Sequence, residues 1–218
     1  TFLLNWRVIV TGLEESVAGR NSAVLEVRRL RGAPDQGALD WYRAWIDPET
    51  GLVMRADEFD ATNQLVSHTE FLTFTLAPDL SGVALHGDRN PGTPFDPTSD
   101  TTRSLGFHVL VPTILPEGYR LERAESLSVG DAGGGTSTWA RLAFGDGVEQ
   151  LFFLQTVAAS GQSALAGSNE VDAGPKSVRI FQVGPWTVVQ GQFNGVRAIV
   201  VGKAELASLL RMLKSAIH

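Results

Sequence analysis

The chain has 218 residues, 43% of them hydrophobic and 19% charged. This composition excludes a disordered protein and suits one large domain or two small ones. No apolar run approaches the roughly 20 residues of a membrane-spanning helix, and the absence of cysteine excludes disulfides and thiolate metal sites. The net charge of −6 divides into −5 over residues 1–82, −1 over 83–106 and 0 over 107–218. Without a basic stripe, this distribution argues against nucleic-acid binding.

The chain begins at Thr1 rather than methionine and shows no signal-peptide pattern. We therefore interpret it as a fragment or a processed product.

Residues 1–82 alternate between apolar and polar side chains in the manner of half-buried strands. In the first of these strands the apolar side chains that share a face are Phe2, Leu4, Trp6, Val8 and Val10. Further strands are expected at 23–30, 39–46, 52–59 and 65–76. Short turns between consecutive strands predict an antiparallel meander, a half-barrel-like sheet without a convincing helix of its own.

Residues 83–106 break this alternation, with prolines, glycines, serines and threonines in no regular period. Such a composition is typical of a linker. We therefore predict a first domain at 1–82, a linker at 83–106 and a second domain at 107–218.

The second domain is predicted to be a smaller antiparallel sheet with one C-terminal helix. Its helix is expected at 203–217, where apolar side chains recur at helical spacing: Leu206, Leu209, Leu210, Leu213 and Ile217. Asn194-Gly195 predicts a tight hairpin turn. The small, polar stretches 131–135 and 158–174 predict exposed loops. The fold class is thus mainly β (α+β).

Catalytic and metal-binding patterns are weak. The acidic residues between Asp47 and Asp60 lack the spacing of a calcium loop, and the glycine-rich stretch 130–137 has no lysine and precedes a strand. The four histidines stand at no metal-ligand spacing and pair with no nucleophile. We expect no enzyme activity, no cofactor and no metal.

The aromatic side chains of the first domain are the richer signal. We predict that they line a hydrophobic, ligand-binding face, because no helix in this part of the sequence would cover them. The alternative interpretation is an ordinary core. At two positions the sequence does not decide which of two neighbouring residues lies on this face, Trp41 or Tyr42 and Trp45 or Ile46, because all four are apolar. The residues assigned to this face are Trp6, Trp41, Trp45, Met54 and Phe71.

Several segments resemble the RseB/MucB family of sigma factor regulatory proteins. In the first domain these are Val17-Ala18-Gly19-Arg20, the run from Trp45 to Arg55, Asp60 and Leu65-Val66-Ser67. In the second they are the run from Val111 to Tyr119 and Phe144-Gly145-Asp146-Gly147. The resemblance implies a LolA-like half-barrel, here without the family's opening helix and first strands, followed by an RseB-type C-terminal domain.

The resemblance also implies a function. The chain would be a periplasmic or otherwise extracytoplasmic regulator, not membrane-spanning, that senses a lipid or hydrophobic peptide and controls an anti-sigma factor in envelope stress signalling. Its partner would be the periplasmic segment of that anti-sigma factor. The alternative is a LolA-type carrier of lipid or lipoprotein with no role in transcription.

For the partner we expect docking on the sheet or an exposed edge of the second domain, because the helix uses its apolar stripe on the sheet. Trp186, Phe193 and Arg197 are residue types that favour interface anchors. The neutral charge of this half predicts a weak dependence on salt.

Overall fold

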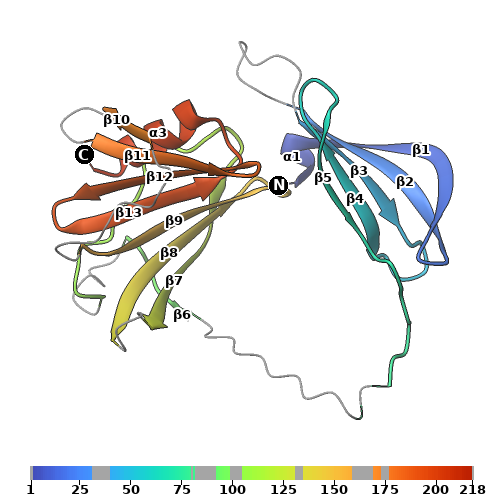
Figure 1. Cartoon of the computed structure of the whole chain (residues 1–218), viewed down its shortest axis with the longest axis horizontal. Helices are drawn as coiled ribbons and strands as arrows, with labels where there is room; N and C mark the ends of the chain where they lie inside the picture. Colours follow the sequence, from blue (N-terminus) through green and yellow to red (C-terminus); the bar gives the residue numbers. More distant parts are fainter. Residues whose placement is uncertain are drawn as a thin grey trace. The chain divides into compact units, whose positions relative to one another are not determined.

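The computed structural model describes residues 2–30, 40–79, 81, 92–98, 105–130, 135–158, 169–172 and 177–217. The chain divides into two compact units, Thr1–Gly87 and Asp88–His218, and each is described by itself (Figure 1). Both are built on an antiparallel sheet, so the predicted mainly-β class is confirmed.

The first unit is the predicted meander. Its five strands lie in sequence order in one sheet. They are β1 (Trp6–Val17), β2 (Arg20–Arg29), β3 (Trp41–Ile46), β4 (Val53–Phe59) and β5 (Leu65–Glu70). Ala18 and Gly19, with φ of 50° and 76°, make the tight turn between β1 and β2.

The start of the chain differs from the prediction. Residues 2–5, expected to begin the first strand, form a short helix, α1 (Phe2–Asn5). The ladder between β1 and β2 begins only at the pair Trp6 and Arg29, and the amide of Leu30 then donates to the carbonyl of Asn5, 2.7 Å away. Because β2 ends there, residues 2–5 have no strand to pair with and coil instead.

The second unit is an eight-stranded sheet in the order β10-β11-β12-β13-β9-β8-β7-β6, so it is larger than the five-stranded first sheet and not smaller as predicted. β6 (Thr93–Pro94) pairs with β7 although it falls within the predicted linker, most of which lies outside the described residues. β10 likewise occupies four residues of the stretch expected to be a loop. The other strands are β7 (Arg120–Gly130), β8 (Thr136–Gly145), β9 (Gln150–Val157), β10 (Asn169–Asp172), β11 (Ser177–Val183), β12 (Trp186–Phe193) and β13 (Val196–Gly202).

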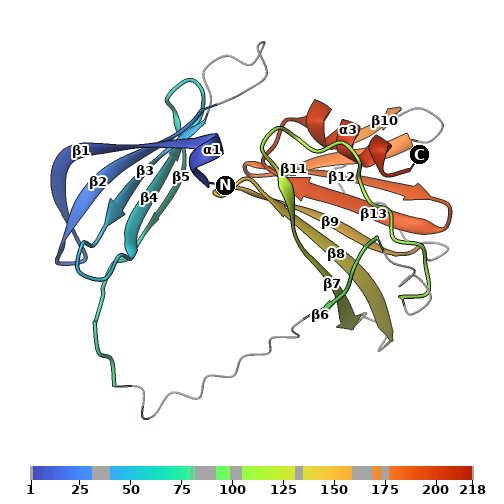
Figure 2. The same ribbon diagram turned by 180° about the vertical axis from the view of Figure 1, so that it is seen from behind.

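Helix α3 (Leu206–Ser215) and the segment 105–119 cover one face of this sheet (Figure 2). The helix buries Leu209, Met212 and Leu213, whereas Leu206 is 38% exposed, so Met212 rather than Leu206 completes the apolar stripe. The Asn194-Gly195 turn is confirmed, with φ of 49° and 80°.

Two polar side chains fasten segment 105–119 in place. Gln155, fully buried, accepts from the amide of Leu110 at 2.6 Å and donates to its carbonyl at 2.9 Å. Ser215, in the last turn of α3, accepts from the amides of Thr113 and Ile114 at 3.2 and 3.0 Å. These bonds satisfy backbone groups that the segment cannot pair within a strand.

Candidate ligand-binding and partner-binding surfaces

Strand register divides the first sheet into two unlike faces. Residues directly opposite in antiparallel strands project to the same face, and neighbours along a strand project to opposite faces. The valine face carries Trp6, Val8, Val10, Leu25, Val27, Tyr42, Ala44 and Ala56. The arginine face carries Val24, Glu26, Arg28, Trp41, Arg43, Trp45, Arg55, Asp57, Phe59 and His68.

Arginines cover the tryptophans of the arginine face. The ring of Trp41 stacks on Phe59, with centroids 4.3 Å apart, and the Arg28 guanidinium lies 4.6 Å from the Trp41 centroid. The guanidinium of Arg55 lies 4.0 Å from the Trp45 ring. Cation–π contacts of this kind exclude water from the ring while the charge stays partly solvated.

Carboxylates neutralise these arginines. The Glu26 carboxylate accepts hydrogen bonds from Arg28 and Arg43. The hydrogen bond from Arg28 is the largest cause of the lowered pKa of Glu26. Burial works to raise the pKa of Asp57, but the hydrogen bonds from Arg55 and His68 outweigh it and hold that pKa below its ordinary value. On the arginine face, ion pairs between arginines and carboxylates therefore lie over the aromatic rings.

Trp45 and Met54 belong to a small core under this network. They pack with Val17 and Val24, and Phe74 covers them from the side. The Trp45 indole donates to Glu15 at 2.9 Å. Phe71 is 46% exposed, and its ring lies 5.9 Å from that of Phe74 in an edge-to-face arrangement.

Trp6 lies on the opposite face of the sheet. It is 1% exposed, makes an edge contact with Tyr42 at 5.7 Å and lies under the Arg29 guanidinium at 4.7 Å. The register explains the separation, since Trp6 is aligned with Arg29, while Trp41 is aligned with the preceding residue, Arg28. The structure thus places Trp41 and Trp45 on one face, packs Met54 with Trp45, and does not bring Trp6 to the same surface.

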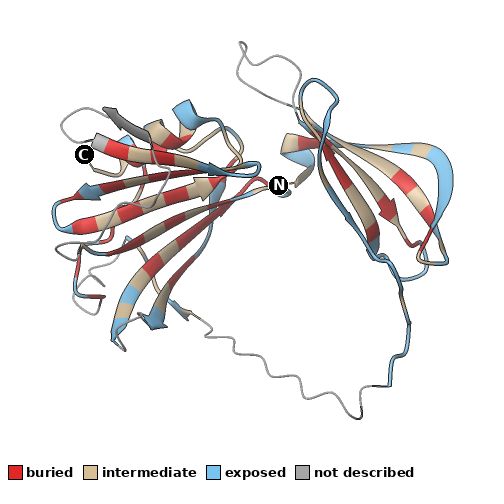
Figure 3. Ribbon diagram, in the orientation of Figure 1, coloured by how far each residue is buried: buried red, intermediate tan, exposed pale blue. Residues whose placement is uncertain are grey.

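The apolar surface open to solvent is the valine face. Val8 and Val10 are 38% and 72% exposed, and Leu25 and Val27 beside them are half-buried (Figure 3). Their equal spacing after Trp6, with Asn5, Arg7 and Thr11 on the other parity, already placed Val8 and Val10 on one face. The sequence could not show that Tyr42 rather than Trp41 shares this face with Val8 and Val10, because both residues are aromatic.

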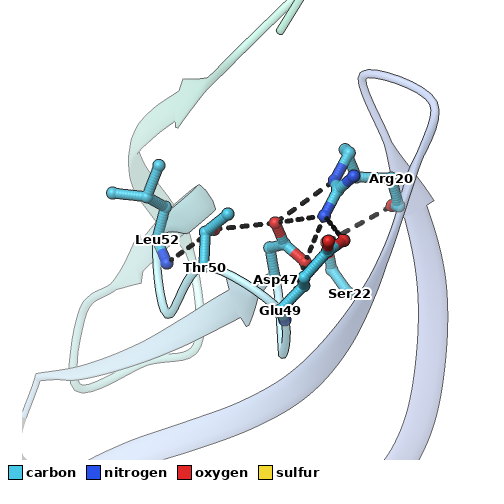
Figure 4. Close-up of polar contacts among 6 residues, drawn as sticks. All are labelled: Arg20, Ser22, Asp47, Glu49, Thr50 and Leu52. Carbon is cyan, nitrogen blue, oxygen red and sulfur yellow. Dashed lines mark hydrogen bonds and ion pairs between the residues drawn. The ribbon is translucent and has the colours of Figure 1, made fainter. Parts of the chain in front are cut away.

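The turn between β3 and β4 is held by a buried carboxylate (Figure 4). Asp47, 1% exposed, accepts from the Thr50 hydroxyl at 2.7 Å and from two nitrogens of Arg20. Arg20 also pairs with Glu49. The hydrogen bond from the Thr50 hydroxyl is the largest cause of the lowered pKa of Asp47, and the Glu49 amide and Arg20 lower this pKa further. This cluster ties the start of β2 to the turn and explains the acidic residues here as structural.

The three predicted partner residues of the second unit do not share a face. Phe193 is 4% exposed and points into the core, where its ring packs against Gly191; a Cβ at Gly191 would stand 2.5 Å from the ring. Trp186 and Arg197 project from the other face. Lys203 lies 5.7 Å from the Trp186 ring, and Arg197 donates to Gln190 at 3.0 Å. Burial lowers the pKa of Arg197.

Among the described residues, no group of three His, Asp or Glu side chains is arranged to hold a metal ion. In the same part of the chain, no helix is long and apolar enough to cross a membrane.

Comparison with known families then places the first unit: residues 3–88 match the sequence model of the MucB/RseB N-terminal domain. The first unit therefore resembles the MucB/RseB N-terminal domain. No curated protein matches the sequence of the chain.

Solved structures extend the likeness to both units. A crystal structure of MucB in complex with MucA(peri) is 21% identical, with a TM-score of 0.57, covering 98% of this chain and 68% of that one. The Pseudomonas aeruginosa MucA/MucB complex is 21% identical, with a TM-score of 0.56 and coverages of 99% and 65%. A structure of MucB is 20% identical, with a TM-score of 0.60 and coverages of 98% and 63%. The chain thus shares the fold of these structures and spans about two thirds of their length.

Proposed function

We propose that this chain is an extracytoplasmic regulatory binding protein whose second unit holds the periplasmic segment of an anti-sigma factor. The observation that carries the proposal is the MucB/RseB N-terminal domain match at residues 3–88, followed by a second unit that continues the fold of MucB. Two of the similar structures are complexes of MucB with MucA. A LolA-type carrier without a role in transcription would not account for this second unit.

Binding of the whole chain to the periplasmic segment of the anti-sigma factor from the same genome tests this function. We expect saturable one-to-one binding by calorimetry. Failure of that segment to bind, with both units folded by circular dichroism, contradicts the regulatory function and leaves the carrier as the better explanation.

We further propose that the valine face takes a lipid acyl chain or a hydrophobic peptide. The support is the row of exposed and half-buried apolar side chains from β1 to β4, which none of the described side chains seals. The arginine face is a poorer candidate, because its tryptophans are already covered by paired arginines. An acyl chain lying along the valine face would bury apolar surface at about 25 cal/mol per Å².

Tryptophan fluorescence titrated with a fatty-acyl probe tests the ligand proposal, because Trp6 lies on that face. Val10→Glu should abolish the probe's effect by placing a charge on the surface. Leu72→Glu is the matched control, since Leu72 is 82% exposed and lies beyond the end of β5. Equal binding by the two variants contradicts a site on the valine face.

A further inference from the structure

The eight-stranded sheet has a second face, opposite α3 and segment 105–119. Its side chains follow from the register in rows that run across the strands. One row is apolar and contains Phe181, Val188, Val201, Phe152 and Ala143. The next row contains Arg179, Gln190, Ile199, Leu154, Arg141 and Glu125. We name these two rows, with Arg197 and Trp139 beside them, the outer face.

The apolar part of the outer face is half-buried rather than sealed. Phe152 and Leu154 on β9, Phe181 on β11 and Ile199 on β13 are each of intermediate exposure, and Val188 on β12 completes the strip. None of the described helices covers it, since α3 packs against the other face. A continuous apolar strip of this kind on a sheet is a surface suited to binding a partner.

Charge on the outer face is unevenly distributed. At the β7–β8 end, Arg141 and Arg123 both pair with the buried Glu125, and Arg141 dominates the lowering of the Glu125 pKa. At the β11–β13 end, the register places Arg179 on the outer face beside Gln190, and Arg197 donates to the amide oxygen of Gln190. On β10 the register aligns Glu170 with Arg179. The arginines of the outer face, Arg123, Arg141, Arg179 and Arg197, therefore outnumber the glutamates aligned with them, Glu125 and Glu170.

We propose that the outer face binds an amphipathic, acidic protein segment, with its apolar side chains over Ile199, Leu154 and Phe152 and its carboxylates at Arg179 and Arg197. Guanidinium groups recognise carboxylates with two parallel hydrogen bonds, which favours an acidic partner over a neutral one. Three strand spacings separate β11 from β9, about 14 Å, so a segment of about nine helical residues reaches from Arg179 to Leu154. This inference rests on the proposed function, because the anti-sigma segment is the partner to which it assigns a surface and a chemistry.

The outer face also changes the expectation for salt. A neutral total charge predicts weak dependence on ionic strength, but the excess of arginines on the outer face creates a local positive field. Between roughly 0.05 and 0.5 M salt we expect the affinity of the whole chain for the periplasmic anti-sigma segment to fall clearly, since exposed charges are screened over that range. An affinity that stays constant with salt overturns the acidic-partner assignment.

Two pairs of variants locate the surface, with the fluorescein-labelled anti-sigma segment as the probe. Arg179→Glu should weaken binding about fivefold or more at low salt, while Arg211→Glu, an equal charge change on α3, should leave it within error. Ile199→Thr should weaken binding about fourfold or more, because a polar hydroxyl replaces the apolar ethyl group on Cβ, while Val157→Thr, on the other face of the sheet, should not.

The outcomes separate the two proposals. If the wild-type chain does not bind the segment, the proposed function fails and this inference fails with it. If it binds and the two outer-face variants behave like their controls, the function stands and the outer face is wrong. Thermal unfolding of each variant confirms that a loss of binding is not a loss of fold.

Discussion

The two units differ in what covers the face of the sheet. The second unit covers one face with helix α3 and segment 105–119, so its core cluster contains 21 buried apolar residues among those described. The first unit has only four buried apolar residues in its described cluster, with arginine–carboxylate pairs lying over its tryptophans. Apolar burial is the main source of stability, whereas partly exposed ion pairs contribute little. We conclude that the second unit is the more stable and that the first keeps an open apolar face.

The largest effect should come from the core of the second unit. Leu213→Ala removes a fully buried α3 side chain and should lower the free energy of unfolding of this unit by about 2–5 kcal/mol. Urea unfolding followed by circular dichroism measures the change. The control is Leu206→Ala, at the exposed position of the same helix, which should change stability far less. Equal losses would show that α3 is not packed as described.

A smaller loss of stability should follow when segment 105–119 loses its hydrogen bonds to Gln155. Gln155→Leu leaves the amide and carbonyl of Leu110 without their partner and should cost about 1–3 kcal/mol. Gln192→Leu, an exposed position on β12, is the control. Hydrogen exchange should show faster exchange of the Leu110 amide in Gln155→Leu. Unchanged protection there would contradict the role of Gln155.

Acid should act on the first unit through Asp47. Its pKa lies below the ordinary value of 3.8 in the folded state, so the unfolded chain binds the proton more readily. The stabilisation from Asp47 is therefore fully present above about pH 4 and is lost as the pH falls through the lowered pKa. Comparing the pH dependence of unfolding in wild type and Asp47→Asn isolates it. We expect the two curves to converge below pH 4, and parallel curves would contradict this prediction.

The smallest effect should come from the exposed charges of the arginine face. Arg28 is 46% exposed, pairs with Glu26 and lies over Trp41. Arg28→Gln should cost no more than about 0.5–1 kcal/mol, because the cation–π contact is partly solvated. Urea unfolding monitored by tryptophan fluorescence measures it, with Arg7→Gln on the same face as a reference. A loss as large as that of Leu213→Ala would show that charge, not apolar burial, stabilises this unit.

Sequence patterns predicted the strands well and the surfaces poorly. Alternation and turn residues located the meander, the Asn194-Gly195 hairpin and α3, because these depend on neighbours within a few residues. The start of β1 was wrong, because whether residues 2–5 pair depends on where β2 ends. Phe193 was expected to be a partner anchor, yet it packs against Gly191 in the core. Its polar neighbours gave no sign of which side of the strand would face the helix.

The sequence by itself determined the fold class, the order of the strands and the resemblance of the first unit to the MucB/RseB N-terminal domain, because each depends on local periodicity and short motifs. Only the tertiary structure decided which parity of each strand is covered. Trp41 and Tyr42 are equally acceptable on an apolar face, and a shift of one residue in register would exchange them. The ladders among β1, β2 and β3 align Trp6 with Arg29 and Trp41 with Arg28. That register placed the arginines over the tryptophans and left the valines open.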